Sequence, residues 1–184
     1  MKYIAILRGI NVGGHRKILM KDLRDLFVGL GYTDVITYIQ SGNVIFEGSV
    51  DENPLDSARR IESAIDEKFG YDVPVIVVSA AELNQAIAAN SYYQSKPEDI
   101  AKFHLTFLSE TPAQNKVELI KDIDFFPDQF EIEGRSVYLS LGGDGKYHKT
   151  KLNNQFFEKK LSIKATTRNW KTVLKLAEMV GGDF

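Results

Sequence analysis

The sequence predicts an α+β protein made of two tandem ferredoxin-like repeats, on two observations. The predicted elements run strand, helix, strand, strand, helix, strand, helix in each half of the chain, and the first six match the split β-α-β order of ferredoxin-like folds. A polar segment at 91–101, carrying Pro97, separates the halves. We therefore expect a first repeat plus an extra helix at 1–90, a linker at 91–101, and a second repeat plus a C-terminal helix at 102–184. The sheets are expected to be antiparallel or mixed, with helices on one face.

In the first half, apolar and alternating runs predict strands at 3–7, 35–40, 44–47 and 74–78, and the wholly apolar first run is typical of a central strand buried on both faces. Apolar residues at helical spacing predict helices at 20–30, at 54–69 and from 80 onward. Asn53 and Pro54 predict the second helix start, and Ser79 with Glu82 forms a capping box for the third.

In the second half, the same patterns predict strands at 102–108, 129–132, 136–141 and 163–166. Helices are expected near 112–114, at 153–161 and around 170–180. Thr111 as N-cap and Pro112 in the first turn predict the start of the first of these helices. Hairpin turns are expected at 41–43 and 133–135, because glycine and asparagine tolerate positive φ.

The composition is that of an ordinary soluble globular protein, with 184 residues, 43% hydrophobic and 26% charged residues, and a formal net charge of −2. Global charge therefore favours neither nucleic acid nor membrane. The absence of cysteine excludes disulfides and thiol catalysis and fits a cytoplasmic location. The segment 146–175, however, carries nine cations and only one acid, Glu158. That asymmetry has two open interpretations: an anion-facing surface or a solvated helix face.

Four motifs carry a family resemblance: LRGINVGG at 7–14, TYIQSGNVIF at 37–46, TKLNN at 150–154 and ATTRNWKTVLKL at 165–176. Over nearly its whole length the chain resembles a bacterial family catalogued as "domain of unknown function 1697". The resemblance implies an α+β fold of two ferredoxin-like repeats and implies no reaction. Thr150 stands where the family is expected to have serine, and threonine keeps the hydroxyl group. The signature residues carried over are Arg8, Gly9, Asn11, Ser41, Gly42, Asn43, Thr167, Arg168, Asn169 and Trp170.

Two glycine-rich loops invite comparison with phosphate-binding loops. At 9–14 the glycines have P-loop spacing, but His15 and Arg16 follow where lysine and a hydroxyl residue are needed, and the dinucleotide fingerprint is absent. The loop at 142–145 also lacks the P-loop spacing. For both loops two interpretations stay open: backbone geometry alone, or an anion cradle. The cations that would serve such cradles are Arg8, Arg16, Lys17, Lys146, Lys149 and Lys151.

Two polar junctions are further candidates. Ser41-Gly42-Asn43 is either a plain hairpin turn or a set of neutral donors and acceptors for a polar ligand. Asn169 or Thr167 suits a helix N-cap and Trp170 a core anchor, whereas Arg168 is a cation poorly placed at a helix N-terminus. Arg168 is therefore expected to bind an anion or to pair with an acid of the other repeat.

We expect the first and third strands of a repeat to be parallel neighbours. On that basis the 9–14 loop and the 41–43 turn lie at opposite edges of their sheet, and the 41–43 turn and the Arg168 junction lie at equivalent edges of their repeats. The expected ligand site therefore lies between the repeats. Its residues are Arg8, Asn11, Ser41, Gly42, Asn43, Arg168 and Asn169.

The function expected from these patterns is binding of a small anionic or polar molecule, nucleotide-like being one option, with no cofactor, metal or membrane partner. The histidines, His15, His104 and His148, show no metal-ligand spacing, and no nucleophile pattern is evident, so a catalytic role is left open. The alternatives are an RNA-binding module using the basic segment, which the strand aromatics do not favour, or a protein-interaction module using open sheet faces or strand edges. The ligand, the packing of the repeats and the oligomeric state are not predicted.

Overall fold

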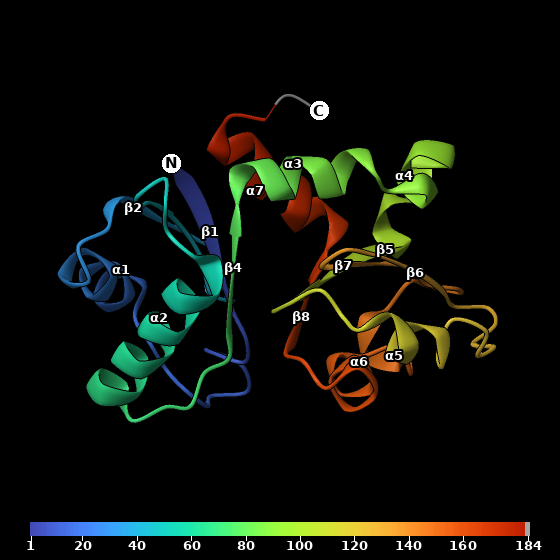
Figure 1. The fold of residues 1–184 in the computed structure, drawn as a ribbon, viewed down its shortest axis with the longest axis horizontal. Coiled ribbons are helices and arrows are strands. Elements are labelled where there is room, and N and C mark those ends of the chain that lie inside the picture. Colours follow the sequence, from blue (N-terminus) through green and yellow to red (C-terminus); the bar gives the residue numbers. More distant parts are fainter. Residues whose placement is uncertain (183–184) are drawn as a thin grey trace. The chain divides into compact units, whose positions relative to one another are not determined.

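A computed structural model describes residues 1–182, which divide into two compact units (Figure 1). The first unit is Met1–Leu83 together with the residues from Leu176 on, and the second is Asn84–Lys175. The divisions fall within two helices, α3 (Ala80–Ala88) and α7 (Trp170–Val180). Each unit contains one four-stranded antiparallel sheet, which confirms the α+β class.

The sheet of the first unit has the strand order β2-β3-β1-β4, and every pair is antiparallel. In the register, Ile4 of the central strand lies opposite Ile45 on one side and Val78 on the other. Two helices, α1 and α2, connect the strands (Figure 1). The elements are β1 (Lys2–Leu7), α1 (Met20–Gly29), β2 (Thr33–Tyr38), β3 (Asn43–Glu47), α2 (Pro54–Phe69) and β4 (Val75–Ser79).

The core of the first unit lies between one face of this sheet and the two helices. Phe27 of α1 and Ile61 of α2 pack with Tyr3, Ala5 and Leu7 of β1. Residues of the opposite face are also buried, namely Ile4, Ile6, Ile45, Ile76 and Val78. The prediction of a central strand buried on both faces is therefore confirmed for β1, and this strand offers no open sheet face for a partner.

The second unit repeats the strand order as β6-β7-β5-β8, again with every pair antiparallel. Leu108, Val137 and Leu139 pack against Phe157 and Leu161 of the helix α6. Residues of the opposite face are buried as well, namely Phe103, Leu105, Phe107 and Tyr138. The elements are α4 (Ser91–Ser95), η1 (Pro97–Lys102), β5 (Phe103–Leu108), α5 (Gln114–Glu118), β6 (Gln129–Glu133), β7 (Ser136–Ser140), η2 (Tyr147–Lys149), α6 (Asn154–Leu161) and β8 (Ala165–Asn169).

Helix starts follow the predicted caps with one exception. Asn53 accepts from the Leu55 backbone N–H at 2.9 Å, and Ser79 and Glu82 make the reciprocal bonds of a capping box. The exception is α5, which begins after Ala113 without a side-chain cap rather than after Thr111.

The polar segment expected as a linker is mostly helical. It forms α4 and η1, because Asn90 caps α4 by accepting from Tyr93 N at 3.2 Å and Pro97 starts the next helical turn. Local caps therefore order a stretch whose composition is polar.

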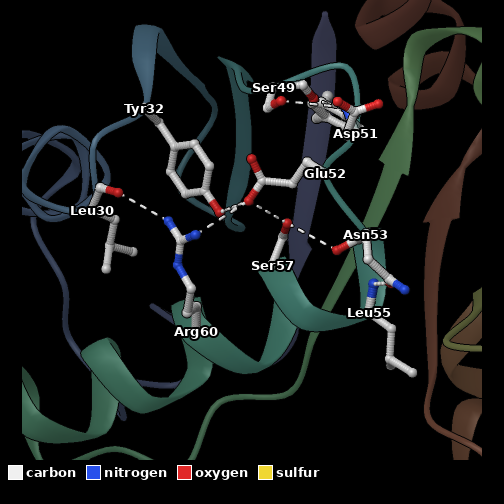
Figure 2. A network of polar contacts seen from close by, with 10 residues as sticks. Leu30, Tyr32, Ser49, Asp51, Glu52, Asn53, Leu55, Ser57 and Arg60 are labelled. Atoms are coloured by element: carbon white, nitrogen blue, oxygen red, sulfur yellow. Dashed lines mark hydrogen bonds and ion pairs between the residues drawn. The ribbon is translucent and has the colours of Figure 1, made fainter.

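One polar network of the first unit has no counterpart among the sequence predictions. The carboxylate of Glu52 accepts from the hydroxyls of Tyr32 at 2.9 Å and Ser57 at 2.8 Å, and Arg60 lies 3.4 Å from the same oxygen (Figure 2). Arg60 also donates to the carbonyl of Leu30 at 2.9 Å. The network ties α2 to the segment that follows α1. Because these groups satisfy one another, we interpret the network as structural.

Among residues 1–182, no helix has both the length and the apolar character needed to cross a membrane.

Candidate functional site

The strand directions bring the first glycine loop and the first hairpin turn together. β1 and β3 are antiparallel, with Ile6 opposite Asn43, so the end of β1 meets the start of β3. The expectation that these strands are parallel, which placed the two motifs at opposite edges, was wrong. The two motifs form one cluster within the first unit, where Asn11 donates to the carbonyl of Gln40 at 3.0 Å.

Asn11 uses its whole side-chain amide to hold this cluster. Its Nδ2 donates to the carbonyls of Ile18 and Gln40, both at 3.0 Å, and its Oδ1 accepts from Ile18 N at 2.9 Å. The backbone at Asn11 has a positive φ of 56°, which asparagine tolerates better than most residues. Both amide hydrogens are bonded to the protein, so the geometry supports a structural role for Asn11.

Gly42 and Asn43 complete the arrangement. Gly42 has φ 85°, and a Cβ placed on it would lie 2.7 Å from Leu7 Cβ and 2.9 Å from Ile10 Cδ1. Asn43 is fully buried and donates to Tyr38 O at 3.1 Å and Ser41 Oγ at 3.2 Å. The hairpin-turn interpretation of 41–43 is confirmed. We call Asn11, Gly42 and Asn43 the interlock, because together they join the loop after β1 to the turn before β3.

The three cations near the interlock, Arg8, Arg16 and Lys17, differ in their contacts and in their exposure to solvent. The backbone N–H of Arg8 donates to Pro74 O at 3.0 Å, which continues the pairing of β1 with the segment before β4. Arg16 is half-buried beside Gly9. A Cβ added to Gly9 would lie 3.3 Å from Arg16 Nη1. Lys17 is exposed. Anion binding by these three residues stays a prediction.

Arg168 and Asn169 lie at a different end of their sheet than expected. β8 is antiparallel to β5, so Asn169 lies opposite His104 at the start of β5. The 133–135 turn lies at the other end, where Arg135 O accepts from Leu108 N at 2.9 Å. The junction between β8 and α7 and the hairpin turn of the same unit therefore lie at opposite ends of the sheet. Arg168 was placed in one site with the 41–43 turn on the assumption that they lie at equivalent ends, and that assumption no longer holds.

Side chains at this junction fulfil the structural expectations. Asn169 Oδ1 accepts from Thr172 N at 2.9 Å, which confirms the N-cap, and Trp170 is fully buried. Arg168 donates to the carbonyl of Thr167 at 3.0 Å. Burial lowers the pKa of Arg168 to about 10, so it remains a cation at neutral pH.

The second glycine loop borders a hollow of about 440 Å³ within the second unit. The loop follows β7 and reaches the start of β5, where Leu141 N donates to Lys102 O at 3.0 Å. The hollow contains two of the three lysines predicted in this region, whereas Lys151 is exposed outside it. Its lining residues are Pro127, Asp128, Leu141, Gly142, Gly143, Asp144, Lys146, Lys149 and Thr150.

Asp128 and Thr150 fix one wall of the hollow. Asp128 accepts from Gly142 N at 2.9 Å and from Thr150 Oγ1 at 2.5 Å, and Thr150 Oγ1 accepts from Leu152 N at 3.0 Å. These bonds explain why a hydroxyl residue suits position 150. A Cβ on Gly142 would overlap the ring of Pro127, so this wall also requires glycine.

Asp144 is the meeting point of the two lysines. Its Oδ2 lies 2.7 Å from Lys149 Nζ and 3.2 Å from Lys146 Nζ. The two ammonium groups hold the pKa of the Asp144 carboxyl well below its usual range. An anionic oxygen is thus stabilised at one defined position beside the glycine loop.

A polar cluster centred on Thr167 was missed by reasoning from the sequence. Its hydroxyl lies 2.7 Å from Thr106 Oγ1, 2.7 Å from Asn154 Oδ1 and 3.0 Å from Tyr147 OH. The signal available was the presence of Asn154 and Thr167 within the shared motifs, but motif membership does not reveal that they meet. His104 stacks on Tyr147 with ring centroids 5.5 Å apart, and its buried Nδ1 has no hydrogen-bond partner among residues 1–182.

His104 makes the stability of the protein depend on pH. Burial lowers the pKa of His104 below its ordinary 6.5. Between this lowered pKa and the ordinary value, the unfolded chain therefore binds more protons than the folded one, and the free energy of unfolding falls as the solution is acidified through that range. The loss amounts to about 1.4 kcal/mol for each unit of pKa lowering.

We expect His104→Gln to flatten the dependence of unfolding free energy on pH between about pH 7 and about pH 5, measured by urea unfolding. The same change at exposed His148 is the matched control and should leave the slope as in the unmodified protein. An unchanged slope in the His104 variant would contradict this assignment.

These features define an α+β protein with two antiparallel sheets, in which shared-motif residues such as Asn11, Gly42 and Asn43 fix loops. The chain belongs to the family described as "Protein of unknown function (DUF1697)", whose model matches residues 1–138. The expected family is thus confirmed. No curated protein matches the chain.

A solved structure gives the same fold. It is described as the structure of the conserved bacterial protein SP0830 from Streptococcus pneumoniae, with 22% sequence identity, a TM-score of 0.78 and coverage of 98% of each chain. At this identity the likeness supports the fold alone. Within residues 1–182, no group of three or more potential ligand side chains could hold a metal ion.

Proposed function

We propose that the protein binds a small phosphate-bearing anion in the hollow beside the 142–145 loop. The observation that carries this proposal is the convergence of Lys146 and Lys149 on one carboxylate oxygen of Asp144, at 3.2 and 2.7 Å. A phosphate oxygen at that position would gain two charge-assisted hydrogen bonds. Asp144 is exposed and belongs to the loop itself, so it can yield the position to a ligand.

The loop conformation supports the same ligand class. Gly143 and Gly145 have positive φ values of 57° and 68°, and the turn that they form directs Lys146 N to Asp144 Oδ1 at 3.3 Å, so a backbone N–H also donates to the carboxylate that a phosphate would replace. The volume of about 440 Å³ falls in the range of small-molecule sites, roughly 300–1,000 Å³. Both observations concern the second unit alone.

We propose further that each unit is a ferredoxin-like repeat. The order β2-β3-β1-β4 with antiparallel pairing recurs as β6-β7-β5-β8, and a helix follows the first and third strand of each sheet. This is the connectivity of a split β-α-β fold. A cytoplasmic location is proposed with it, on the absence of cysteine.

Calorimetric titration with inorganic phosphate and with adenosine monophosphate tests the anion site. We expect the double variant Lys146→Gln, Lys149→Gln to bind at least about tenfold more weakly, a loss of ~1.4 kcal/mol. Asp144→Asn should bind several-fold more tightly, because it removes the carboxylate that competes for the lysines. Lys121→Gln, at an exposed lysine paired with Glu118, is the control and should bind as the unmodified protein does.

Absence of phosphate and nucleotide binding by the unmodified protein would overturn the proposal, as would equal affinities for the Asp144 and Lys146/Lys149 variants. A short single-stranded RNA that binds without any phosphate binding, and is released at high salt, would instead support the nucleic-acid alternative.

A further inference from the structure

A second hollow lies in the first unit, independent of the proposed anion site. It encloses about 500 Å³ beside the edge strand β2, between β3 and the last turn of α7. We infer that this hollow binds a small ligand with an apolar body and a cationic amine head. Its lining residues are Lys2, Asp34, Val35, Ile36, Ile45, Glu47 and Met179.

Apolar side chains form the larger part of the hollow. Ile36 lies opposite Ile45 in the β2–β3 register, so the two side chains are neighbours on one face of the sheet. Ile45 is buried, whereas Ile36 is 49% exposed although it is a large aliphatic residue on a strand. Val35 and Met179 complete the apolar lining. An aliphatic ligand would remove the exposed part of Ile36 from water, which is favourable.

Three charged side chains give the hollow its polarity. Lys2 lies opposite Glu47 in the β1–β3 register, and Asp34 belongs to the edge strand. None of the three makes an ion pair with the described part of the chain, residues 1–182. Two carboxylates and one ammonium group line the hollow, so it has an excess of negative charge and favours a cationic head over an anionic one.

The backbone of β2 is irregular at this place. The pairing with β3 shifts between Thr33 and Ile36, and Asp34 has a positive φ of 47°. Such a bulge re-aims side chains and is over-represented beside binding sites. Positive φ in a non-glycine residue is also uncommon and carries strain, which the fold retains beside the charged part of the hollow.

Three probes of equal chain length separate the contributions of charge and apolar body: n-octylamine, n-octanol and sodium n-octanoate, each titrated below its aggregation threshold. We expect n-octylamine to bind most tightly and n-octanoate most weakly. The size of the hollow accommodates a chain of this length, since small-molecule sites occupy roughly 300–1,000 Å³.

Single variants separate the contribution of the charged residues to binding from that of the apolar lining. Glu47→Gln and Asp34→Asn should each weaken n-octylamine binding up to about fivefold, the value of a partly solvated ion pair, and should leave n-octanol binding unchanged. Ile36→Asn should weaken n-octylamine and n-octanol binding alike. Glu98→Gln, at an exposed acid of the second unit, is the matched control and should change nothing.

Tighter binding of n-octanoate than of n-octylamine would overturn the inference, because Lys2 would then dominate. It is equally overturned if none of the three probes binds, or if Glu47→Gln and Glu98→Gln behave alike. Circular dichroism of each variant establishes that the fold is retained. Since the hollow and the phosphate site share no residue, failure of one proposal leaves the other untouched.

Discussion

Replacing Gly42 with alanine is expected to lower the free energy of unfolding by about 2–5 kcal/mol. Two effects combine. The residue has φ 85°, a conformation that costs any side chain roughly 1–2 kcal/mol. The new Cβ would also lie 2.7 Å from Leu7 Cβ and 2.9 Å from Ile10 Cδ1, and both of these residues are fully buried in a close-packed core.

Gly14→Ala separates these two effects. Gly14 has a similar φ of 79°, but nothing lies within 4 Å of the position that a Cβ would take there. We expect it to lose only the conformational part, about 1–2 kcal/mol. Urea unfolding of both variants measures the difference. Equal losses would show that the contact with Leu7 and Ile10 relaxes freely, and the interlock would then have no steric component.

Replacing Asn11 with alanine is expected to lower the free energy of unfolding by about 2–4 kcal/mol. Three hydrogen bonds to Ile18 and Gln40 are lost, each with a net value of roughly 0.5–1.5 kcal/mol, and the partly buried groups of Ile18 are left unpaired. Hydrogen exchange should show the Ile18 amide less protected than in the unmodified protein.

Asn11→Asp provides the second arm of this experiment. Aspartate keeps an acceptor for Ile18 N but sets a carboxylate against the carbonyls of Ile18 and Gln40, so we expect a loss at least as large as with alanine. Full stability of either variant would contradict the structural role.

Much of the secondary structure follows from local pattern. The apolar run at 3–7 predicts a doubly buried strand, and the caps at Asn53 and Ser79 predict helix starts, because both signals depend on neighbours within a few residues. The relative direction of β1 and β3 was predicted wrongly, although the order of the elements along the chain determines it. A hairpin reverses the chain between β2 and β3, and a helical crossover makes β1 and β2 run the same way, so β1 and β3 must be antiparallel.

The candidate site was harder to predict, for a different reason. Asn11 and Asn43 look like ligand-binding amides in the sequence, but each donates to a backbone carbonyl, Gln40 O and Tyr38 O respectively, and backbone groups carry no sequence signal. Lys146 and Lys149 were predicted as anion-binding candidates because charge accumulates visibly in one segment, and both line the hollow beside the 142–145 loop. The meeting of Tyr147, Asn154 and Thr167 depends on how three elements fold together, and spacing along the chain does not encode it.

The division of α7 between the units bears on how the chain folds during synthesis. Residues from Leu176 on belong to the first unit, and Met179 borders a hollow with β2 and β3 there. Nascent domains generally fold in the order of their translation. Here the unit that begins first is completed only after the whole of Asn84–Lys175 has been made, so a ribosome stalled before Leu176 would carry a first unit that still lacks the end of α7.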